Sequence, residues 1–597
     1  MVSTLLAVWA LLASMVVSVL AQTATPSPAG CTAGSSGIGD PYFPLMGNSG
    51  YTVLHYDLDL DLDVTGGAID AGQATIEAVA LVDLCAFNLD FRGLEIEGIT
   101  VDGAPATFTR LGGELTVEPA MTLPAGAPFT TEIAYHGIPL GQDAPTVGSL
   151  AAMVLGGILG MGGGEQKHPP EEGDQYGSGW WHGRDTIFIA GEPAGAESWF
   201  PVNGHPSDKA TYTVRLTVPD PFSVVANGIL TKTTTTGDRT TTVWESDDPM
   251  ASYLVVFHAG LLDVEVREGP NGLPLRLAFA SSVGAGQRAM FDKLPVMIDY
   301  FQSVFGPYPF DSAGGTVVGA PILFALETQT LPIFGEIPLL GANALTAEEL
   351  AGFEAIVAHE LAHQWYGNTV SVMRWQDIWL NEGFATYAQL LWLEEAEGIV
   401  ARNHEIAKVY AVHAALARFQ DPALLAALNA RDVIDGYRSY SQRFLGRRIE
   451  EEFARRYQAG LNAETVSDLE SIPATDGLLQ LTAQGVPEAL FPGETLLTGD
   501  PGPANLFSPT AVYQRGALTL HALRLQIGDE AFFAILRAWP ERFHNGNAAT
   551  GDFITLAEEI SGDELSEFFE AWLFQPGLPR LTPVEAVQPG AATPVAD

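Results

Sequence analysis

Residues 359–363 read His-Glu-Leu-Ala-His, which places two histidines four positions apart. The surrounding stretch, 346–366, has the signals of a single helix. It begins with Thr346-Ala347-Glu348-Glu349, a capping-box pattern, and it ends before Gly367, a residue type that is common just after a helix. The sequence therefore predicts that the histidines lie within one helix of about twenty residues.

On such a helix, positions i and i+4 share a face, so His359 and His363 can present their imidazole rings to one metal ion. Glu360 is offset by one position and can lie beside the ion without binding it, as a general base acting on metal-bound water must. A catalytic zinc site has three protein ligands and one open position. A third ligand is therefore needed.

A histidine shortly downstream is excluded as that ligand, because the positions that would hold Gly and His are Tyr366 and Thr369. Glu382, nineteen residues after His363, lies near the start of a second helical run that ends before Gly398. Two antiparallel helices joined by a short loop would bring Glu382 back to both histidines. The pattern predicts a His-His-Glu zinc site.

The alternative is an ordinary helix with surface histidines and a surface glutamate. Apolar residues flank the motif, namely Ile356, Val357, Leu361 and Trp365, which indicates a mostly buried helix. Buried His and Glu need partners, and a metal ion supplies one. We favour the metal site.

Composition excludes several classes of protein. The 597 residues carry a formal net charge of −44, which disfavours nucleic acid and anionic lipid as partners. The 47% of hydrophobic residues excludes a largely disordered chain. The two cysteines, Cys31 and Cys85, are too few for a disulfide scaffold, and either one disulfide or two thiols is compatible with the sequence.

The N-terminal segment predicts export. An apolar run covers Leu5–Ala21, and a Thr/Pro/Ser/Gly-rich stretch follows it. We interpret 1–21 as a signal peptide and 22–45 as a linker. An uncleaved membrane anchor is the alternative, and both interpretations place the mature chain outside the cytoplasm, as a secreted or extracytoplasmic protein.

Residues 46–260 are expected to form a β-domain. His55–Val64 alternates leucine with aspartate, which predicts a half-exposed strand more than a calcium site. The Gly-rich stretch 148–179 interrupts this pattern and indicates no role. Other strand-like runs are Ala74–Leu84, Thr130–Tyr135, Tyr212–Val218 and Ser252–His258.

Residues 261–582 are expected to form a mixed α+β domain, and 583–597 a tail. A strand is predicted at Gly315–Leu326. Besides the helix around the histidines, helices are predicted at 285–303, 379–397, 401–418, 438–459, 511–526, 529–543 and 550–573.

Several motifs together resemble one known family. HELAHQWYGN followed by WQDIWLNEGFATY is similar to the zinc aminopeptidases that include aminopeptidase N and leukotriene hydrolase, a gluzincin family with the signature HExxH, eighteen residues, then Glu. The resemblance runs from about Gly39 to Leu581. Further segments that match the family are Ala325–Gln329, Gly191–Pro193, Trp199–Pro201, Pro206–Ala210 and Tyr513–Ala517.

The resemblance implies a fold and an activity. The fold would be multidomain α+β: a β-sandwich-like N-terminal domain, then a thermolysin-like mixed α/β catalytic domain, without the large C-terminal helical domain of many relatives. The activity would be that of a secreted zinc aminopeptidase acting on peptides with a free N-terminus.

It also implies roles for individual residues. One Zn²⁺ per chain would be held by His359, His363 and Glu382, with Glu360 as the general base. Glu327 and Glu192 would bind the substrate's α-amino group, which is largely cationic near neutral pH. Leu326 would supply an apolar wall for the first side chain, and Tyr513 would donate a hydrogen bond to the oxyanion.

The chain departs from the family at three places. Leu326-Glu327-Thr328 stands where the family has Met-Glu-Asn, and Glu192 stands where Gln is common. Glu382 and Tyr513 are 131 residues apart, about twice the family's spacing, which requires an insertion within 400–505. Tyr437 and Tyr440 lie at a spacing nearer the family's, but their flanking residues do not match.

Two alternatives remain open. The same metal site would serve an endopeptidase or an epoxide hydrolase of small lipids. A metal-free binding scaffold with the same fold is a different class, and the joint presence of the metal-site residues and Tyr513 argues against it.

Overall fold

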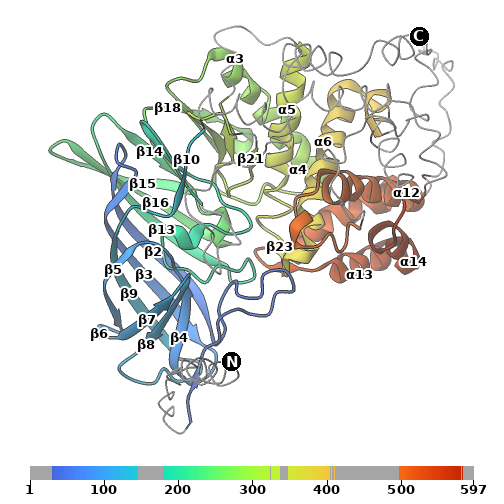
Figure 1. Cartoon of the computed structure of the whole chain (residues 1–597). Coiled ribbons are helices and arrows are strands. Elements are labelled where there is room, and N and C mark those ends of the chain that lie inside the picture. The colour runs from blue at the N-terminus through green and yellow to red at the C-terminus, as the bar shows by residue number, and fades with distance from the viewer. Residues whose placement is uncertain are drawn as a thin grey trace, which may run out of the picture.

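The computed structural model describes residues 30–145, 179–322, 324–336, 347–403, 405–406, 409, 497–579 and 581. A strand-rich N-terminal part lies beside a C-terminal part that combines a small sheet with most of the helices (Figure 1). This is the multidomain α+β organisation that the sequence predicts. The stretches 1–21, 148–178 and 583–597 lie outside the described residues, as do most of the insertion in 400–505 and all of the helix predicted at 438–459.

The largest sheet has eight strands in the order β15-β16-β13-β2-β3-β9-β5-β6. Most neighbours are antiparallel, whereas β2 and β13 are parallel. The strands are β15 (Ile229–Thr236), β16 (Arg239–Met250), β13 (Ala210–Pro219), β2 (Tyr51–Asp63), β3 (Ala68–Ala80), β9 (Pro128–Gly137), β5 (Glu95–Val101) and β6 (Ala104–Pro105).

Strand β2 has the predicted alternation. Its leucines at 58, 60 and 62 are buried, because they face the core, while the aspartates face the other side of the sheet. Two of these carboxylates form ion pairs across the sheet, Asp57 with Arg215 and Asp61 with Arg239. These partners fit a half-exposed strand face rather than a calcium site.

Two smaller sheets complete the N-terminal part, with orders β1-β4-β8-β7 and β10-β11-β12-β17-β14. A disulfide joins Cys31 to Cys85, so the pairing that the sequence left open is present. The strands are β1 (Thr32–Ala33), β4 (Leu84–Asp90), β8 (Glu114–Glu118), β7 (Thr107–Leu111), β10 (Gly141–Asp143), β11 (Trp180–Gly183), β12 (Thr186–Ile189), β17 (Phe257–Gly260) and β14 (Ser223–Ala226).

The strand predicted at Ser252–His258 is wrong in its first half, where Ser252–Leu254 forms a 3₁₀ turn before β17 begins. The side chain of Asn227 explains the difference. Its amide nitrogen donates to the carbonyl of Leu254, and its oxygen accepts from the amide of Val256. These backbone groups are therefore paired with a side chain instead of a neighbouring strand.

The C-terminal part contains a mixed sheet in the order β18-β19-β20-β22-β21. The predicted strand Gly315–Leu326 is interrupted at Gly319-Ala320-Pro321, since proline has no N–H for the ladder. The strands are β18 (Leu262–Glu268), β19 (Pro274–Ala280), β20 (Ala313–Val318), β22 (Ile333–Gly335) and β21 (Ala325–Leu326). A separate pair, β23 (Ser371–Val372) and β24 (Asn547–Ala548), joins the loop after α5 (Ala347–Ala362) to the C-terminal helices.

The helices largely follow the prediction, with breaks at glycine and proline. Pro295 lies in the first turn of α4, where its missing N–H has no helical partner to lose. Gly528 interrupts α12 at φ 81°, and Gly562 ends α13 in the left-handed region, so 550–573 is not one helix. The helices are α3 (Ala285–Arg288), α4 (Leu294–Phe305), α5, α6 (Trp379–Glu397), α12 (Arg515–Arg542), α13 (Thr550–Ser561) and α14 (Ser566–Phe569), with π-helical turns at Pro509–Gln514 and Glu570–Phe574.

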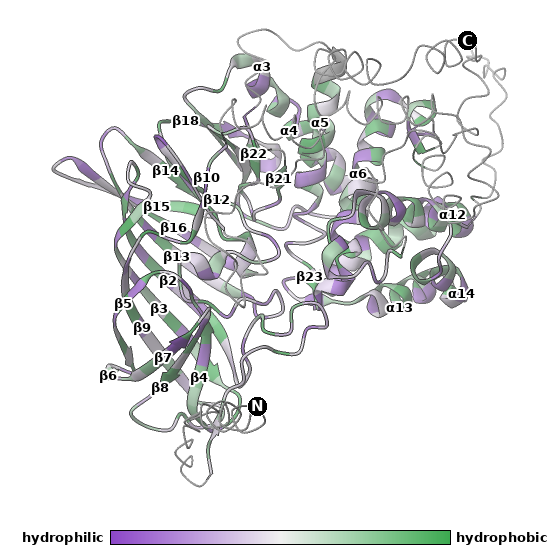
Figure 2. Ribbon diagram, viewed as in Figure 1, coloured by the Kyte–Doolittle hydropathy of each residue, from purple (hydrophilic) through white to green (hydrophobic). Residues whose placement is uncertain are grey.

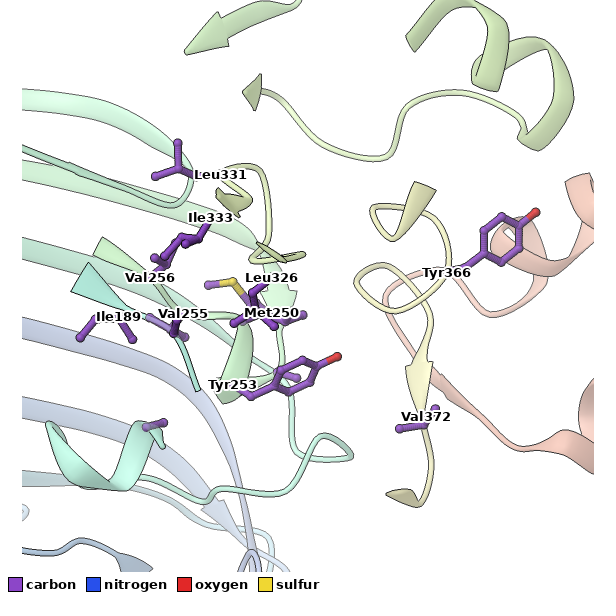
Figure 3. Packing of buried hydrophobic residues seen from close by; sticks show 14 of the residues in the cluster. Ile189, Met250, Tyr253, Val255, Val256, Leu326, Leu331, Ile333, Tyr366 and Val372 are labelled. Carbon is purple, nitrogen blue, oxygen red and sulfur yellow. The ribbon is translucent and has the colours of Figure 1, made fainter. Parts of the chain in front are cut away.

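One continuous cluster of buried hydrophobic residues runs from the large sheet to the helices. Hydrophobic segments, coloured green, occur in both the sheets and the helices (Figure 2). Figure 3 shows residues of both parts within the cluster, such as Val256 from the N-terminal part and Ile333 from the mixed sheet of the C-terminal part. This packing fixes the two parts against each other. None of the described helices is both long and apolar enough to cross a membrane.

Candidate metal centre and substrate site

The predicted ligands meet where α5 contacts α6. His359 lies in the last turn of α5, His363 directly follows the end of this helix, and Glu382 lies in the first turn of α6 with only 2% of its surface exposed. One oxygen of Glu382 is 3.2 Å from Nε2 of His359 and 3.5 Å from Nε2 of His363. The structure thus brings together all three residues, as the spacing of the motif predicts.

These distances fit a zinc ion. Zinc–ligand bonds of about 2.0–2.1 Å in a tetrahedron place neighbouring ligand atoms about 3.3 Å apart. The candidate ligand atoms all lie within 4.8 Å of one another. His363 is also oriented for this role, since its Nδ1 lies 3.0 Å from the carbonyl oxygen of Tyr366. That contact leaves Nε2 directed at Glu382, as in metal sites where a second hydrogen bond fixes the ring.

Burial and mutual attraction set the charges of these groups. Burial raises the pKa of Glu382, but His363 and His359 outweigh it and lower the pKa to about 2. Burial lowers the pKa of His363, whereas Glu327 and Glu382 raise it to about 10. A protonated His363 therefore offsets the charge of Glu382. A bound dication would take over the role of the protonated histidine.

Glu360, the predicted general base, is buried beside the ligands. Glu360, Glu327 and His363 form a second set of possible metal ligands. The carboxylate oxygens and the ring nitrogen of this set lie within 4.8 Å of one another. Burial raises the pKa of Glu360 well above its usual value, and His363 opposes the shift. A raised pKa suits a carboxylate that takes up a proton during a reaction.

Glu327 and Glu192 form a further carboxylate cluster with Glu382, again within 4.8 Å. Glu327 follows the edge strand β21, and Glu192 lies in the loop after β12. Oε1 of each is buried and has no hydrogen-bond partner among the described residues. Burial raises the pKa of Glu327 to about 6, despite the proximity of His363, and raises that of Glu192 well above its usual value.

Two residues that the sequence analysis left without a role hold Glu327 in place. Nδ2 of Asn368 donates to the carbonyl oxygen of Glu327 at 2.7 Å, and Nε2 of Gln364 donates to the same oxygen at 3.2 Å. Oε1 of Gln364 also accepts from the amide of Thr330. One feature of the sequence could have indicated this role. Gln364 and Asn368 carry side-chain amides on an otherwise buried stretch, and buried amides must be paired.

Tyr513 lies over His359, with ring centroids 5.9 Å apart and an interplanar angle of 9°. It belongs to the π-helical turn Pro509–Gln514 that leads into α12, and such turns are frequent at functional sites. Burial raises the pKa of its hydroxyl well above 10, so the group stays protonated and able to donate. Tyr437 and Tyr440 lie outside the described residues.

Leu326, the predicted apolar wall for the first side chain, packs in the core. It is 5% exposed and belongs to the hydrophobic cluster (Figure 3). A cavity of about 390 Å³ instead opens beside Glu192, lined by Phe43, Pro193 and the segment 503–509. Leu326 is not among its lining residues. Side chains alternate along a strand, so the one before Glu327 points to the opposite side.

Comparison with known proteins agrees with this geometry. Residues 289–437 match the peptidase family M1 domain, and residues 180–254 match the peptidase M1 N-terminal domain. The chain thus contains one segment similar to the peptidase M1 domain and another similar to the peptidase M1 N-terminal domain. The two matches contain His359, His363, Glu382 and both carboxylates of the neighbouring cluster.

Among the relatives of this chain, glutamyl aminopeptidase from Bitis rhinoceros is 25% identical over 402 residues, which cover 65% of the chain and 34% of the relative. Aminopeptidase M1-B from Oryza sativa subsp. japonica is 24% identical over 532 residues, which cover 88% of the chain and 50% of the relative. The chain therefore spans between a third and a half of the length of these relatives.

Solved structures show the same fold. The M1 zinc metallopeptidase from Deinococcus radiodurans superposes with a TM-score of 0.64 at 24% identity, covering 91% of this chain and 99% of that one. Zinc is the metal named for these solved structures, and the match to the peptidase M1 domain supports zinc as the cofactor of this chain. The predicted zinc is thus confirmed at the level of the family, and the geometry above identifies the residues that fit it.

Proposed function

We propose that the chain is an aminopeptidase that uses one zinc ion to remove the N-terminal residue from peptides. The observation that carries this proposal is the pair of carboxylates, Glu192 and Glu327, beside the three candidate zinc ligands. Glu382 belongs to both sets, so the two sites are adjacent. The thermolysin-like catalytic fold that the resemblance implies agrees with the arrangement of α5, α6 and the mixed sheet.

The carboxylate pair is suited to an α-ammonium group. A buried carboxylate oxygen without a partner is unfavourable, and both Glu192 and Glu327 have one. A cation placed between them would relieve this penalty and their mutual repulsion. Because the pair is next to the metal ligands, a substrate held there by its amino terminus presents its first peptide bond to them.

The chain's own residues account for the remaining steps. Zinc, when bound by His359, His363 and Glu382, supplies Lewis acidity toward the scissile carbonyl and toward water. Glu360 is placed to accept a proton from water and to return it to the leaving amine. Tyr513, protonated and stacked on His359, is placed to donate a hydrogen bond to the developing oxyanion.

The relatives support this proposal. Several are named as aminopeptidases, and one solved M1 zinc metallopeptidase from Deinococcus radiodurans is described as bound to a Tyr-Ser-Ala substrate. A peptide with a free amino terminus is therefore the substrate class we propose for this chain.

Export is part of the proposal. The disulfide between Cys31 and Cys85 supports an oxidising compartment, in agreement with the apolar run at Leu5–Ala21. N-terminal sequencing of the protein purified from the culture medium would test this. We expect a mature chain that begins near Gln22, and a cell-associated chain that retains Met1 would contradict cleavage.

The activity is tested with one peptide in two forms, with a free and with an acetylated amino terminus. We expect stepwise loss of N-terminal residues from the free form, none from the acetylated form, and loss of activity with a zinc chelator. Equal cleavage of both forms would contradict the aminopeptidase and favour an endopeptidase. A Glu360→Gln variant with the parent's full activity would contradict the role of Glu360.

A further inference from the structure

The cavity beside Glu192 is built partly by the N-terminal segment of the chain. It has a volume of about 390 Å³, within the usual range for a small-ligand site. Its walls come from Phe43, from Glu192 and Pro193, and from the segment 503–509 that leads to Tyr513. Phe43 is thus brought to the site from a segment that the sequence analysis assigns to a linker ending at residue 45.

Asp40 anchors this segment to both parts of the molecule. Its carboxylate accepts hydrogen bonds from the amides of Tyr42 at 2.8 Å and Phe43 at 2.9 Å. It also accepts one from the amide of Trp375 at 3.0 Å and lies 3.2 Å from Nε2 of His205. These contacts fix the backbone of Phe43, because a buried carboxylate with four donors allows the turn little freedom.

Phe43 and its neighbours also pack against the loop that precedes α6. The ring of Phe43 contacts the indole of Trp375 edge-to-face, with centroids 6.1 Å apart. Nε1 of Trp375 donates to the sulfur of Met46 at 2.9 Å. Trp375 lies seven residues before Glu382, so the segment is held against the turn that leads into the helix carrying a candidate zinc ligand.

Tyr42 holds the opposite wall of the cavity. Its hydroxyl donates to the carboxylate of Asp500 and accepts from the amide of Gly502 at 2.8 Å. These two residues lead directly into the segment 503–509. One side chain therefore ties the N-terminal segment to the loop that completes the cavity.

We propose that Asp40–Met46 is part of the substrate site, where Phe43 determines the preferred first side chain and Tyr42 positions the loop 500–509. This inference rests on the proposed function, because it places the substrate's amino group on Glu192. Glu192 also lines the cavity, so the first side chain of that substrate extends into it. Phe43 supplies an aromatic wall of this space from the N-terminal segment, and Phe507 contributes a second aromatic ring from the loop.

The lining of the cavity selects an uncharged apolar side chain. Phe43, Pro193, Leu506 and Phe507 supply apolar surface. Among the described residues that line the cavity there is no lysine or arginine, and Glu192 is acidic. A phenylalanine or leucine side chain is therefore accommodated, whereas an aspartate or glutamate side chain meets a carboxylate and no cation.

The test compares 4-nitroanilides of Phe, Leu, Ala and Glu on the zinc-loaded parent and on variants. We expect the parent to prefer Phe and Leu over Glu. Phe43→Ala should lower kcat/KM for the Phe substrate by about tenfold and for the Ala substrate by less than about threefold. The control is Leu111→Ala, which lies on β7 outside this segment and is 87% exposed, and it should leave both values unchanged.

A second variant keeps the test valid if Phe43→Ala does not fold. Ala504→Phe adds volume at the exposed rim of the cavity, and it should reduce hydrolysis of the Phe and Leu substrates while sparing the Ala substrate. Equal effects of either variant on all substrates would overturn the role of this cavity. A parent that cleaves the Ala and Glu substrates better than the Phe and Leu substrates would overturn it too. A parent that cleaves none of them contradicts the proposed aminopeptidase activity itself.

Discussion

Gly383 and Gly516 face each other where α6 crosses α12, so closely that a Cβ atom added to Gly516 would lie 2.8 Å from the Cα of Gly383. Gly383 follows the candidate ligand Glu382, and Gly516 lies three residues after Tyr513. The contact between these two glycines thus sets the distance between the metal centre and the tyrosine. It also explains why Tyr513 reaches the site although a long insertion separates it from Glu382.

Gly516→Ala should separate these two elements. The new methyl group would meet backbone, which cannot move aside as a flexible side chain can. We expect kcat/KM to fall by at least about tenfold, because a displacement of a few tenths of an ångström to 1 Å disturbs the reacting geometry. Gly551→Ala, on α13 with open space at its Cβ position, is the matched control and should leave kcat/KM unchanged. An active Gly516→Ala variant would contradict the role of the crossing.

Arg515 should stabilise the turn that carries Tyr513. Its guanidinium donates to the carbonyl oxygens of Trp572 at 2.8 Å and Gln575 at 2.7 Å. Arg515→Met would leave the carbonyl of the buried Trp572 unpaired, at a cost of about 1–3 kcal/mol, and should lower both Tm and kcat. Arg542→Ala removes only an exposed ion pair with Glu559 and should change stability by less than about 1 kcal/mol. Equal Tm changes for the two variants would argue against this function of Arg515.

The helices and ligands of the metal centre could be predicted from the sequence, since a helix fixes which residues share a face. His359, His363 and Glu382 meet as expected because their positions depend on only two adjacent helices. The breaks at Pro321, Gly528 and Gly562 are also local properties of proline and glycine.

What could not be predicted depends on contacts between distant residues. Asp40 binds the amide of Trp375, and Tyr42 binds Asp500, across more than 300 positions of the chain. A polar stretch rich in Gly and Pro gives no sign of such partners, so the segment around Phe43 resembles a linker in sequence. The orientation of Leu326 was likewise decided by the core it packs against, not by the motif around it.

Lys209 should make stability depend on pH. Its Nζ donates to the carbonyl oxygens of Asn368 at 2.8 Å and Thr369 at 3.0 Å, and burial lowers its pKa to about 7. The unfolded chain, with a lysine pKa of about 10.4, binds the proton more strongly between pH 7 and 10. The folded state therefore gains stability as pH rises through this range, by up to about 1.4 kcal/mol per pH unit from this group, and the penalty is constant below pH 7.

The measurement is Tm of the parent and of Lys209→Met between pH 7 and 9.5. We expect Tm of the parent to rise relative to that of the variant as pH increases. Comparison with the variant removes the contribution of every other titrating group. A constant difference between the two curves would show that Lys209 does not change its charge on unfolding in this range.

The disulfide should stabilise the N-terminal part. Cys31 and Cys85 are 54 positions apart, and closing a loop of that length in the unfolded chain is worth about 4 kcal/mol. We expect the double variant Cys31→Ser/Cys85→Ser to have a lower Tm with unchanged kcat at low temperature. A reductant should produce the same shift in the parent and none in the variant. Identical Tm values for parent and variant would contradict a stabilising bridge.

Zinc content tests the central claim most directly, by mass spectrometry of the purified parent and of His363→Ala. The account predicts about one zinc ion per parent chain, and little zinc and no aminopeptidase activity in His363→Ala. The control Gly551→Ala should match the parent. A parent that binds no zinc, or a His363→Ala variant with as much zinc as the parent, would contradict the metal centre at His359, His363 and Glu382.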